Sequence, residues 1–210
     1  MMPIMPSAAP PVIAPIHVRW ADFISDMFSP PVLWAMLSPV IAFHGTPSLM
    51  QGVVSTLICI IFVCVLPSLY ILWLFHKGII SDIYLPFPQE RIRPFLFSIG
   101  STFVGYVLAR TLNLTSIIDG FLLATFFQLI LLLIITFFWK ISTHTLAISA
   151  TAALISLWFG PLPGIGLVPL VVLIAAARLR LRRHTWSEVT GGIILGTVMV
   201  ICLVRIFSLV

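Results

Sequence analysis

The stretch ARLRLRRHTWSE, residues 177–188, is the densest run of charge in the chain and lies between two apolar segments. Within it, Arg178 precedes His184 by six positions and Glu188 follows His184 by four. If a helix begins near His184, this i, i+4 spacing lets the carboxylate meet the imidazole on one helix face. Such a carboxylate fixes the imidazole tautomer, and guanidinium groups bind phosphate through paired hydrogen bonds. The stretch therefore predicts a phosphate site built around a nucleophilic histidine.

The remaining arginines of this stretch have a simpler explanation. Arg180, Arg182 and Arg183 lie in a short loop between two apolar segments, where basic residues set the orientation of a membrane protein and contact lipid headgroups. We therefore interpret these three as topology determinants and leave them out of the predicted site.

Composition places the chain among membrane proteins. Of its 210 residues, 60% are hydrophobic and 8% are charged, whereas a soluble domain has about 25% charged residues. Apolar runs of about 20 residues, long enough to cross a bilayer, recur along the whole chain. We predict an all-α, polytopic transmembrane helical bundle. Its net charge of +5 belongs to loops, and without a soluble basic domain we predict no nucleic-acid partner.

The apolar pattern divides the chain into an N-terminal segment, residues 1–30, and a transmembrane helical domain, residues 31–210. Six prolines within residues 1–30 forbid a long helix there, although residues 17–28 could form a short interfacial helix. The three cysteines all lie in apolar runs, which is typical of buried structural thiols. We predict seven spans, at residues 31–46, 50–75, 95–112, 116–138, 143–160, 163–178 and 187–208.

The parity of these spans predicts the orientation of the chain. The loop at 76–94, the short loop at Lys140 and the loop at 178–186 fall on one side of the membrane. This side carries nine of the eleven basic residues, and the opposite side has only Arg110 and Arg205. The positive-inside rule then predicts a multi-pass protein whose motif-bearing face is cytoplasmic.

Three polar clusters on this face resemble the signature motifs of the PAP2 superfamily, the type 2 phosphatidic acid phosphatases and related membrane lipid phosphatases. The third motif matches at Arg178, His184 and, with glutamate for aspartate, Glu188, while Ala177 replaces a serine. The second motif keeps Ser142 and His144 but has Ile141 and Thr143 in place of proline and glycine. The first keeps Arg93-Pro94, with Pro86 at the lysine position. Arg91, Lys77 and Lys140 are nearby cations that could replace this lysine.

The resemblance implies a role for each matching residue. His184 would attack phosphorus and form a phosphohistidine, with Glu188 orienting its ring. His144 would protonate the leaving oxygen as general acid. Three groups would surround the phosphoryl oxygens: Arg178, Arg93 and the Ser142 hydroxyl. The scheme requires no cofactor and no metal, and its substrate would be a lipid phosphate or polyprenyl pyrophosphate with its tail among the membrane lipids and spans.

The departures from the family pattern leave a second hypothesis open. With Pro86 for lysine and an altered second motif, the chain could be a catalytically impaired PAP2-like subunit, with a structural role among other membrane subunits of a larger complex. The Pro-rich N-terminal segment agrees with this reading, since such a tail rarely orders without a partner surface. A transporter or channel is a distant third, because no span carries a convincing internal polar pathway.

Overall fold

The computed structural model describes residues 18–44, 46 and 48–206, and within these ranges every regular element is helical. The N-terminal part of the predicted Pro-rich segment, residues 1–17, lies outside the described residues. The elements, in chain order, are α1 (Arg19–Met27), α2 (Pro30–His44), α3 (Leu49–Cys59), the π-helix η1 (Ile60–Val65), α4 (Leu66–His76), α5 (Pro88–Thr111), α6 (Ser116–Thr136), α7 (Thr143–Phe159), α8 (Pro161–Gly166), α9 (Val168–Arg180) and α10 (Trp186–Ile206).

The all-α membrane bundle is confirmed, with a smaller number of full-length spans than the seven predicted. Five continuous helices of the described chain are long and apolar enough to cross a membrane, and a sixth results if α1 and α2, bent by 41° at their junction, count as one span. The remaining predicted span is α7, which is apolar but has only 17 residues. Its ends are fixed by Ser142 before it and Gly160 after it.

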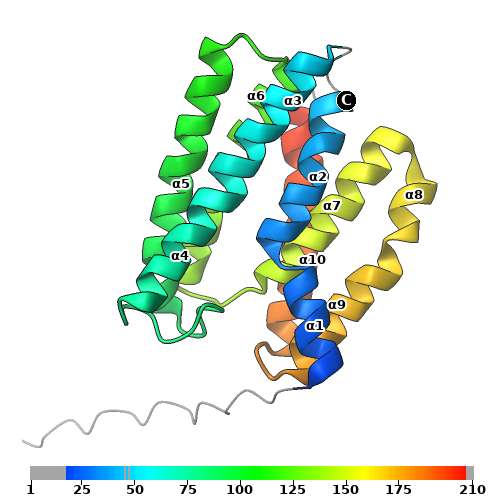
Figure 1. Ribbon diagram of the computed structural model, residues 1–210. Helices are drawn as coiled ribbons and strands as arrows, with labels where there is room; N and C mark the ends of the chain where they lie inside the picture. The colour runs from blue at the N-terminus through cyan, green and yellow to red at the C-terminus, as the bar shows by residue number, and fades with distance from the viewer. Residues whose placement is uncertain (1–17, 45, 47, 207–210) are drawn as a thin grey trace, which may run out of the picture.

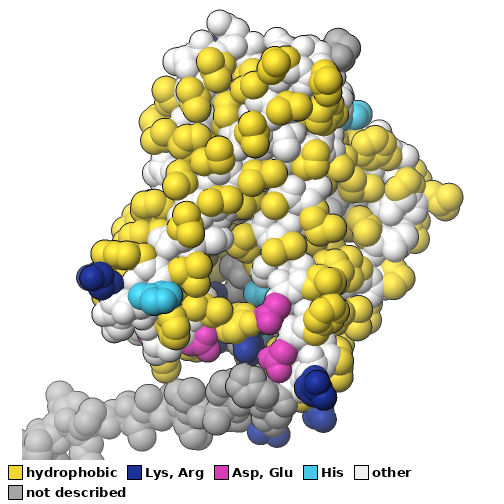
Figure 2. Space-filling model, viewed as in Figure 1, with side chains coloured by type: hydrophobic (Ala, Val, Ile, Leu, Met, Phe, Trp, Pro, Cys, Tyr) yellow, Lys and Arg dark blue, Asp and Glu magenta, His cyan; other side chains and the backbone are white. Residues whose placement is uncertain are grey.

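The three motif-bearing segments lie at one end of the bundle (Figure 1). The chain turns there between α4 and α5, between α6 and α7, and between α9 and α10. We call this the site end. Figure 2 shows hydrophobic side chains over the flank of the molecule and charged side chains gathered near the site end. At the opposite end, Arg110 and Asp119 join α5 to α6 through an ion pair of 2.9 Å.

Helices α7 and α10 pack closely enough that their backbones nearly touch. A Cβ atom at Gly192 would lie 2.6 Å from the Ser142 carbonyl oxygen, and one at Gly196 would lie 2.3 Å from the Leu146 carbonyl oxygen. Two glycines four residues apart form the small-residue face that lets membrane helices approach each other. This contact sets the position of the second motif, on α7, relative to the third motif, at the start of α10.

The span formed by α3, η1 and α4 widens into a π-helix just before Pro67. Proline lacks an amide hydrogen and its ring clashes with the preceding turn, which explains the local change in hydrogen bonding. The Ser101 hydroxyl of α5 donates to the Phe62 carbonyl oxygen over 2.6 Å. The distorted turn is therefore stabilised by the neighbouring helix.

Helix α1 occupies part of the predicted interfacial segment and packs beside the end of α9, at the site end. Its Ala21 is fully buried with Ala177 and Leu181 of the α9 end, whereas Trp20 and Phe23 are exposed. The buried face of α1 also carries Ser25. The helix therefore places polar side chains over the motif residues, and its location in the membrane interface stays a prediction.

We predict that Gly196→Ala destabilises the bundle. The new methyl group would overlap the Leu146 carbonyl oxygen, and overpacking of this kind costs about 1–3 kcal/mol. The matched control is Gly100→Ala in α5, where an added Cβ meets no atom within 4 Å. The measurement is the thermal unfolding midpoint in detergent. Equal midpoints for the two variants would contradict the close α7–α10 contact.

Candidate active site

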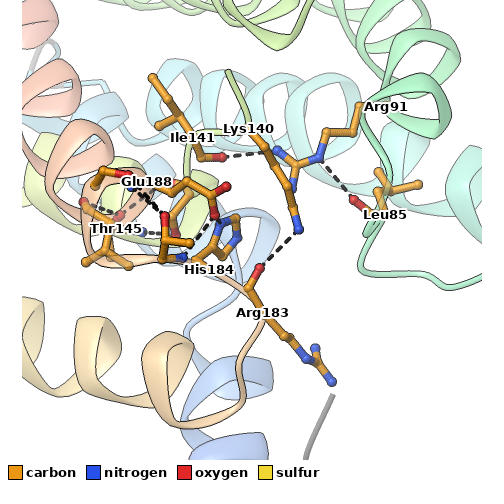
Figure 3. A network of polar contacts seen from close by, with 12 residues as sticks. Leu85, Arg91, Lys140, Ile141, Thr145, Arg183, His184 and Glu188 are labelled. Carbon is orange, nitrogen blue, oxygen red and sulfur yellow. Dashed lines mark hydrogen bonds and ion pairs between the residues drawn. The ribbon is translucent and has the colours of Figure 1, made fainter. Parts of the chain in front are cut away.

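His184 and Glu188 form a hydrogen-bonded pair at the start of α10 (Figure 3). After α9 the chain reverses through Arg182, whose φ of 52° is in the left-handed region, and this turn brings His184 inward. The His184 Nδ1 atom lies 2.9 Å from Glu188 Oε2, which also accepts from the Thr185 amide over 3.1 Å. Because an ionised carboxylate only accepts hydrogen bonds, Nδ1 carries the proton and Nε2 of the neutral ring keeps a free lone pair.

The surroundings of His184 keep its imidazole neutral. Burial lowers the pKa of His184 to about 4, and the positive charges of Arg178, Arg91 and Lys140 act in the same direction. The hydrogen bond to Glu188 opposes this shift and raises the pKa. At neutral pH the ring is therefore uncharged, the state in which its free nitrogen can act as a nucleophile.

Two buried arginines lie in this cluster without an ion-pair partner among the described residues. Arg178 is 2% exposed and Arg91 is 5% exposed. The Nη1 atom of Arg178 donates to Ser25 Oγ over 2.5 Å, whereas its Nε is buried without a hydrogen-bond partner among the described residues. Arg91 donates to the carbonyl oxygens of Leu85, at 3.0 Å, and Ile141, at 3.1 Å. Since a buried charge is costly unless it is compensated, these guanidinium groups favour an anionic ligand.

Two further cations border the cluster. Lys140 Nζ donates to the Arg183 carbonyl oxygen over 3.1 Å. The Arg183 guanidinium lies 3.5 Å from the Tyr84 ring centre and 3.6 Å from an Asp22 oxygen, and its Nη1 is buried without a partner. Positive charge in this region therefore comes from the loops at Lys140 and Arg183 as well as from Arg91 of α5 and Arg178 of α9.

His144 faces the same region from the first turn of α7. Its Nε2 lies 3.2 Å from the Ser25 carbonyl oxygen, which can only accept, so Nε2 is the donor. Its Nδ1 is buried and has no hydrogen-bond partner among the residues that the structure describes. His144 is within electrostatic range of Arg178, His184 and Arg183. A second imidazole nitrogen thus faces the cluster in an unsatisfied state.

Ser142 connects the second and third motifs. Its backbone amide donates to the Glu188 carbonyl oxygen over 3.1 Å, and its hydroxyl accepts from the Thr145 amide at 3.4 Å as the cap of α7. The contact fixes the register of α7 against α10. The hydroxyl therefore has a structural partner in addition to the phosphate role expected for it.

The structure brings five of the six predicted site residues to the site end as one cluster: His184, Glu188, Arg178, His144 and Ser142. It does not bring in Arg93, which is exposed. Arg91 lies in the cluster instead. Residues two positions apart on a helix point in directions about 200° apart, so Arg91 faces inward where Arg93 faces outward. The inward face of α5 carries Arg91, Pro94, Ser101 and Gly105. This spacing of small and buried residues is the sequence signal that favours Arg91.

A cavity of about 480 Å³ opens beside the cluster. Tyr84, Arg91 and His144 line its polar part, and most of the other lining residues are apolar, from α2, η1, α4, α5, α6 and α7. Figure 2 shows the surface hollowed near the charged side chains of the site end. The arrangement places an apolar chamber next to an unsatisfied positive cluster.

Comparison with known proteins identifies the family. The family model of the PAP2 superfamily matches residues 89–209, more than half of the chain. The chain belongs to the PAP2 superfamily. No curated protein and no solved structure matches it. The PAP2 match contains all six predicted site residues, Arg91 and Lys140, whereas α1 and Ser25 lie before it.

The described residues also contain no group of three or more His, Cys, Asp or Glu side chains that could hold a metal ion.

We predict that His184 makes the protein lose stability in acid. Its folded pKa of about 4 is below the unfolded value of about 6.5, so the folded state binds fewer protons. The free energy of unfolding is therefore unaffected by the titration of His184 above pH 6.5 and falls by about 3 kcal/mol as the pH is lowered to 4. The measurement is the unfolding midpoint in detergent between pH 7.5 and 4.5.

The comparison for this prediction is His184→Gln, which removes the titrating ring and keeps a donor for Glu188. Its midpoint should fall less than that of the parent protein over the same pH range. His76→Gln, at an exposed histidine of α4, should behave like the parent. An equal fall in His184→Gln and the parent would contradict the assignment.

Proposed function

We propose that this PAP2 superfamily member is an integral membrane phosphatase that hydrolyses a lipid phosphate or polyprenyl pyrophosphate through a phosphohistidine at His184. The observation that carries the proposal is the neutral His184 ring, oriented by Glu188 at 2.9 Å, beside two buried arginines that have no ion-pair partner in the described part of the chain. A nucleophile with its orienting carboxylate is the arrangement that activates a side chain. Buried donors without partners are suited to stabilise charge on a phosphoryl group.

In the first step, the Nε2 lone pair of His184 attacks phosphorus, and the bond from phosphorus to the lipid oxygen breaks. The leaving oxygen takes a proton from Nδ1 of His144, whose Nε2–H stays on the Ser25 carbonyl oxygen. Because His144 is buried beside cations, its ring holds this second proton only while the negative charge of the bound phosphate offsets them. Arg178 and Arg91 hold the phosphoryl oxygens. Their charges are fixed before the reaction, so little reorganisation accompanies the transfer.

In the second step, a water molecule attacks the phosphohistidine, and its proton moves to Nδ1 of His144, which is now neutral. The P–N bond breaks, phosphate leaves, and the electron pair returns to Nε2 of His184. Glu188 keeps its hydrogen bond to Nδ1 throughout and stabilises the positive charge on the ring while phosphorus is attached.

The cavity supports a lipid substrate over a soluble phosphate ester. Its polar end includes Arg91 and His144, and its remaining walls are mainly apolar. Burial of an apolar chain is favourable by about 25 cal/mol per Å². A lipid whose phosphate binds at the cluster would therefore have its hydrocarbon tail next to the apolar walls of the cavity.

We also propose that the site opens to the cytoplasmic side. Five exposed cations border the site end: Arg19, Lys77, Arg93, Arg180 and Arg182. The two on the opposite end are Arg110 and Arg205. This is the bias that the positive-inside rule associates with cytoplasmic loops.

The second candidate is a catalytically impaired subunit of a membrane complex. The observation in its favour is that Ser25 of α1 already engages both His144 and Arg178. The replaced lysine at Pro86 agrees with it. Under this hypothesis the motif residues would hold α1 in place, and the purified protein would not turn over lipid phosphates.

Phosphate release from lipid phosphates in detergent micelles separates the two candidates. We predict that His184→Ala lowers the rate by about 10³-fold or more, since residues of such a unit act together. His76→Ala, at an exposed histidine, should keep the parent rate. Acid-labile phosphate on the parent protein, absent in His184→Ala, would identify the intermediate. Equal rates for the parent and His184→Ala would exclude the catalytic role.

We predict further that Leu129→Trp, which fills part of the cavity, discriminates against long chains. The value of kcat/KM for a long-chain lipid phosphate should fall about tenfold or more, because the tail loses apolar burial, while that for a short, water-soluble analogue changes little. The matched control is Ile134→Trp, on the exposed face of the same helix. A uniform fall for both substrates would contradict a tail-binding role of the cavity.

A further inference from the structure

We propose that Lys140, on the loop between α6 and α7, is a phosphate ligand of this site and supplies the ammonium group that the first motif lacks. The inference rests on the proposed function and assigns a residue that the family pattern does not include. The first motif has Pro86 where the family has its lysine. Lys140 reaches the same cluster from another loop.

The direction of the Lys140 side chain is the first observation. Its Nζ donates to the Arg183 carbonyl oxygen over 3.1 Å, its only hydrogen bond among the described residues. Figure 3 shows the side chain running beside that of Arg91, with the ammonium group directed at the loop of Arg183 and His184. Since an ammonium group has three donors, two remain for oxygens of a ligand.

The charge around Lys140 is the second observation. Its ammonium is within electrostatic range of Arg91 and Arg178, both cations, and of Glu188. A lysine at the end of a membrane helix ordinarily extends toward water, whereas this one is half-buried beside other cations. Burial, and after it the charge of Arg91, lowers the pKa of Lys140. A bound phosphate would offset this repulsion.

The backbone on both sides of Lys140 is held in place. A Cβ at Gly191 would lie 2.4 Å from the Trp139 ring, so the indole packs directly on α10. The Ile141 carbonyl oxygen accepts from Arg91 over 3.1 Å, and the Ser142 amide donates to Glu188. The backbone at Lys140 is therefore held in place by its neighbours. A pre-ordered loop loses less conformational entropy when a ligand binds.

The experiment compares Lys140→Met and Lys140→Gln with Lys77→Met, which alters the only other lysine of the chain, an exposed one. Glutamine keeps a donor for the Arg183 carbonyl oxygen and removes the charge. The first measurement is kcat/KM for a lipid phosphate in micelles. The second is the rise in unfolding midpoint caused by orthovanadate or inorganic phosphate, which requires no turnover.

We expect both Lys140 variants to lower kcat/KM by about 30- to 100-fold, as for loss of a charged donor to a phosphoryl group. They should lose most of the anion-induced rise in midpoint, as Arg91→Met should, while Lys77→Met and Arg93→Met keep both properties. Lys140→Arg should recover part of the loss, because it restores a positive charge. Without anion, Lys140→Gln should unfold at the parent midpoint.

The outcomes separate this inference from the proposed function. Parent-like turnover and a full anion-induced rise in Lys140→Gln would overturn the role of Lys140 and leave the phosphatase proposal standing. A parent protein without turnover, whose stabilisation by anion is lost in Lys140→Gln, would overturn the phosphatase proposal and retain Lys140 as an anion ligand. A lower midpoint without anion combined with an unchanged anion-induced rise would reduce Lys140 to a loop anchor and overturn the inference.

Discussion

The close contact of α7 with α10 is the constraint on which the site depends. Gly192 and Gly196 allow the two backbones to approach, and the Ser142 amide donates directly to the Glu188 carbonyl oxygen. This bond joins the residue before α7 to the residue that orients His184. Two imidazoles forty positions apart thereby acquire a fixed relation, although each is on a different helix. A bulkier residue at either glycine would move one motif against the other.

The electrostatics of the site depend on positive charges that are buried away from water. Charges interact more strongly in a low dielectric, so Arg178, Arg91 and Lys140 both depress the pKa of His184 and create a demand for an anion. The same cations thus have two effects that suit phosphoryl transfer. Under the proposed function, they keep His184 uncharged before the substrate arrives and attract the phosphate group that His184 attacks. The hydrogen bond to Glu188 raises the pKa of His184 and so opposes the first effect, while it fixes the orientation of the ring.

The sequence predicts the fold class well because hydrophobicity alone determines it. Apolar runs near 20 residues require helices in a bilayer, and the parity of the loops places the three motifs together at the site end. The number of spans is harder to predict, since Pro30, Ser142 and Gly160 end or begin helices within apolar sequence. Helix α7 is therefore shorter than a full span, although it is as apolar as the spans themselves.

The site is predicted in part, and the reasons differ between residues. His184 and Glu188 follow from an i, i+4 spacing, a local rule that helix geometry enforces. The family's Arg-Pro pair predicts Arg93, whereas the helical phase of α5 directs Arg91 inward together with Pro94 and Ser101. Ser25 gives no signal of this kind, because its contacts with His144 and Arg178 span more than a hundred positions and depend on how α1 packs beside α9.

The contacts of α1 bear on which candidate function is correct. Ser25 engages one nitrogen of each partner: Nε2 of His144 and an Nη1 of Arg178. The other buried nitrogens, Nδ1 of His144 and Nε of Arg178, have no partner. A helix that had taken over the site as a structural ligand would be expected to satisfy these two polar groups, because an unsatisfied buried group costs about 1–3 kcal/mol. Ser25 instead fixes the tautomer of His144 and leaves Nδ1 available. Under the proposed function, this pattern suits a residue that orients a catalytic histidine, and it supports the enzyme over the impaired subunit.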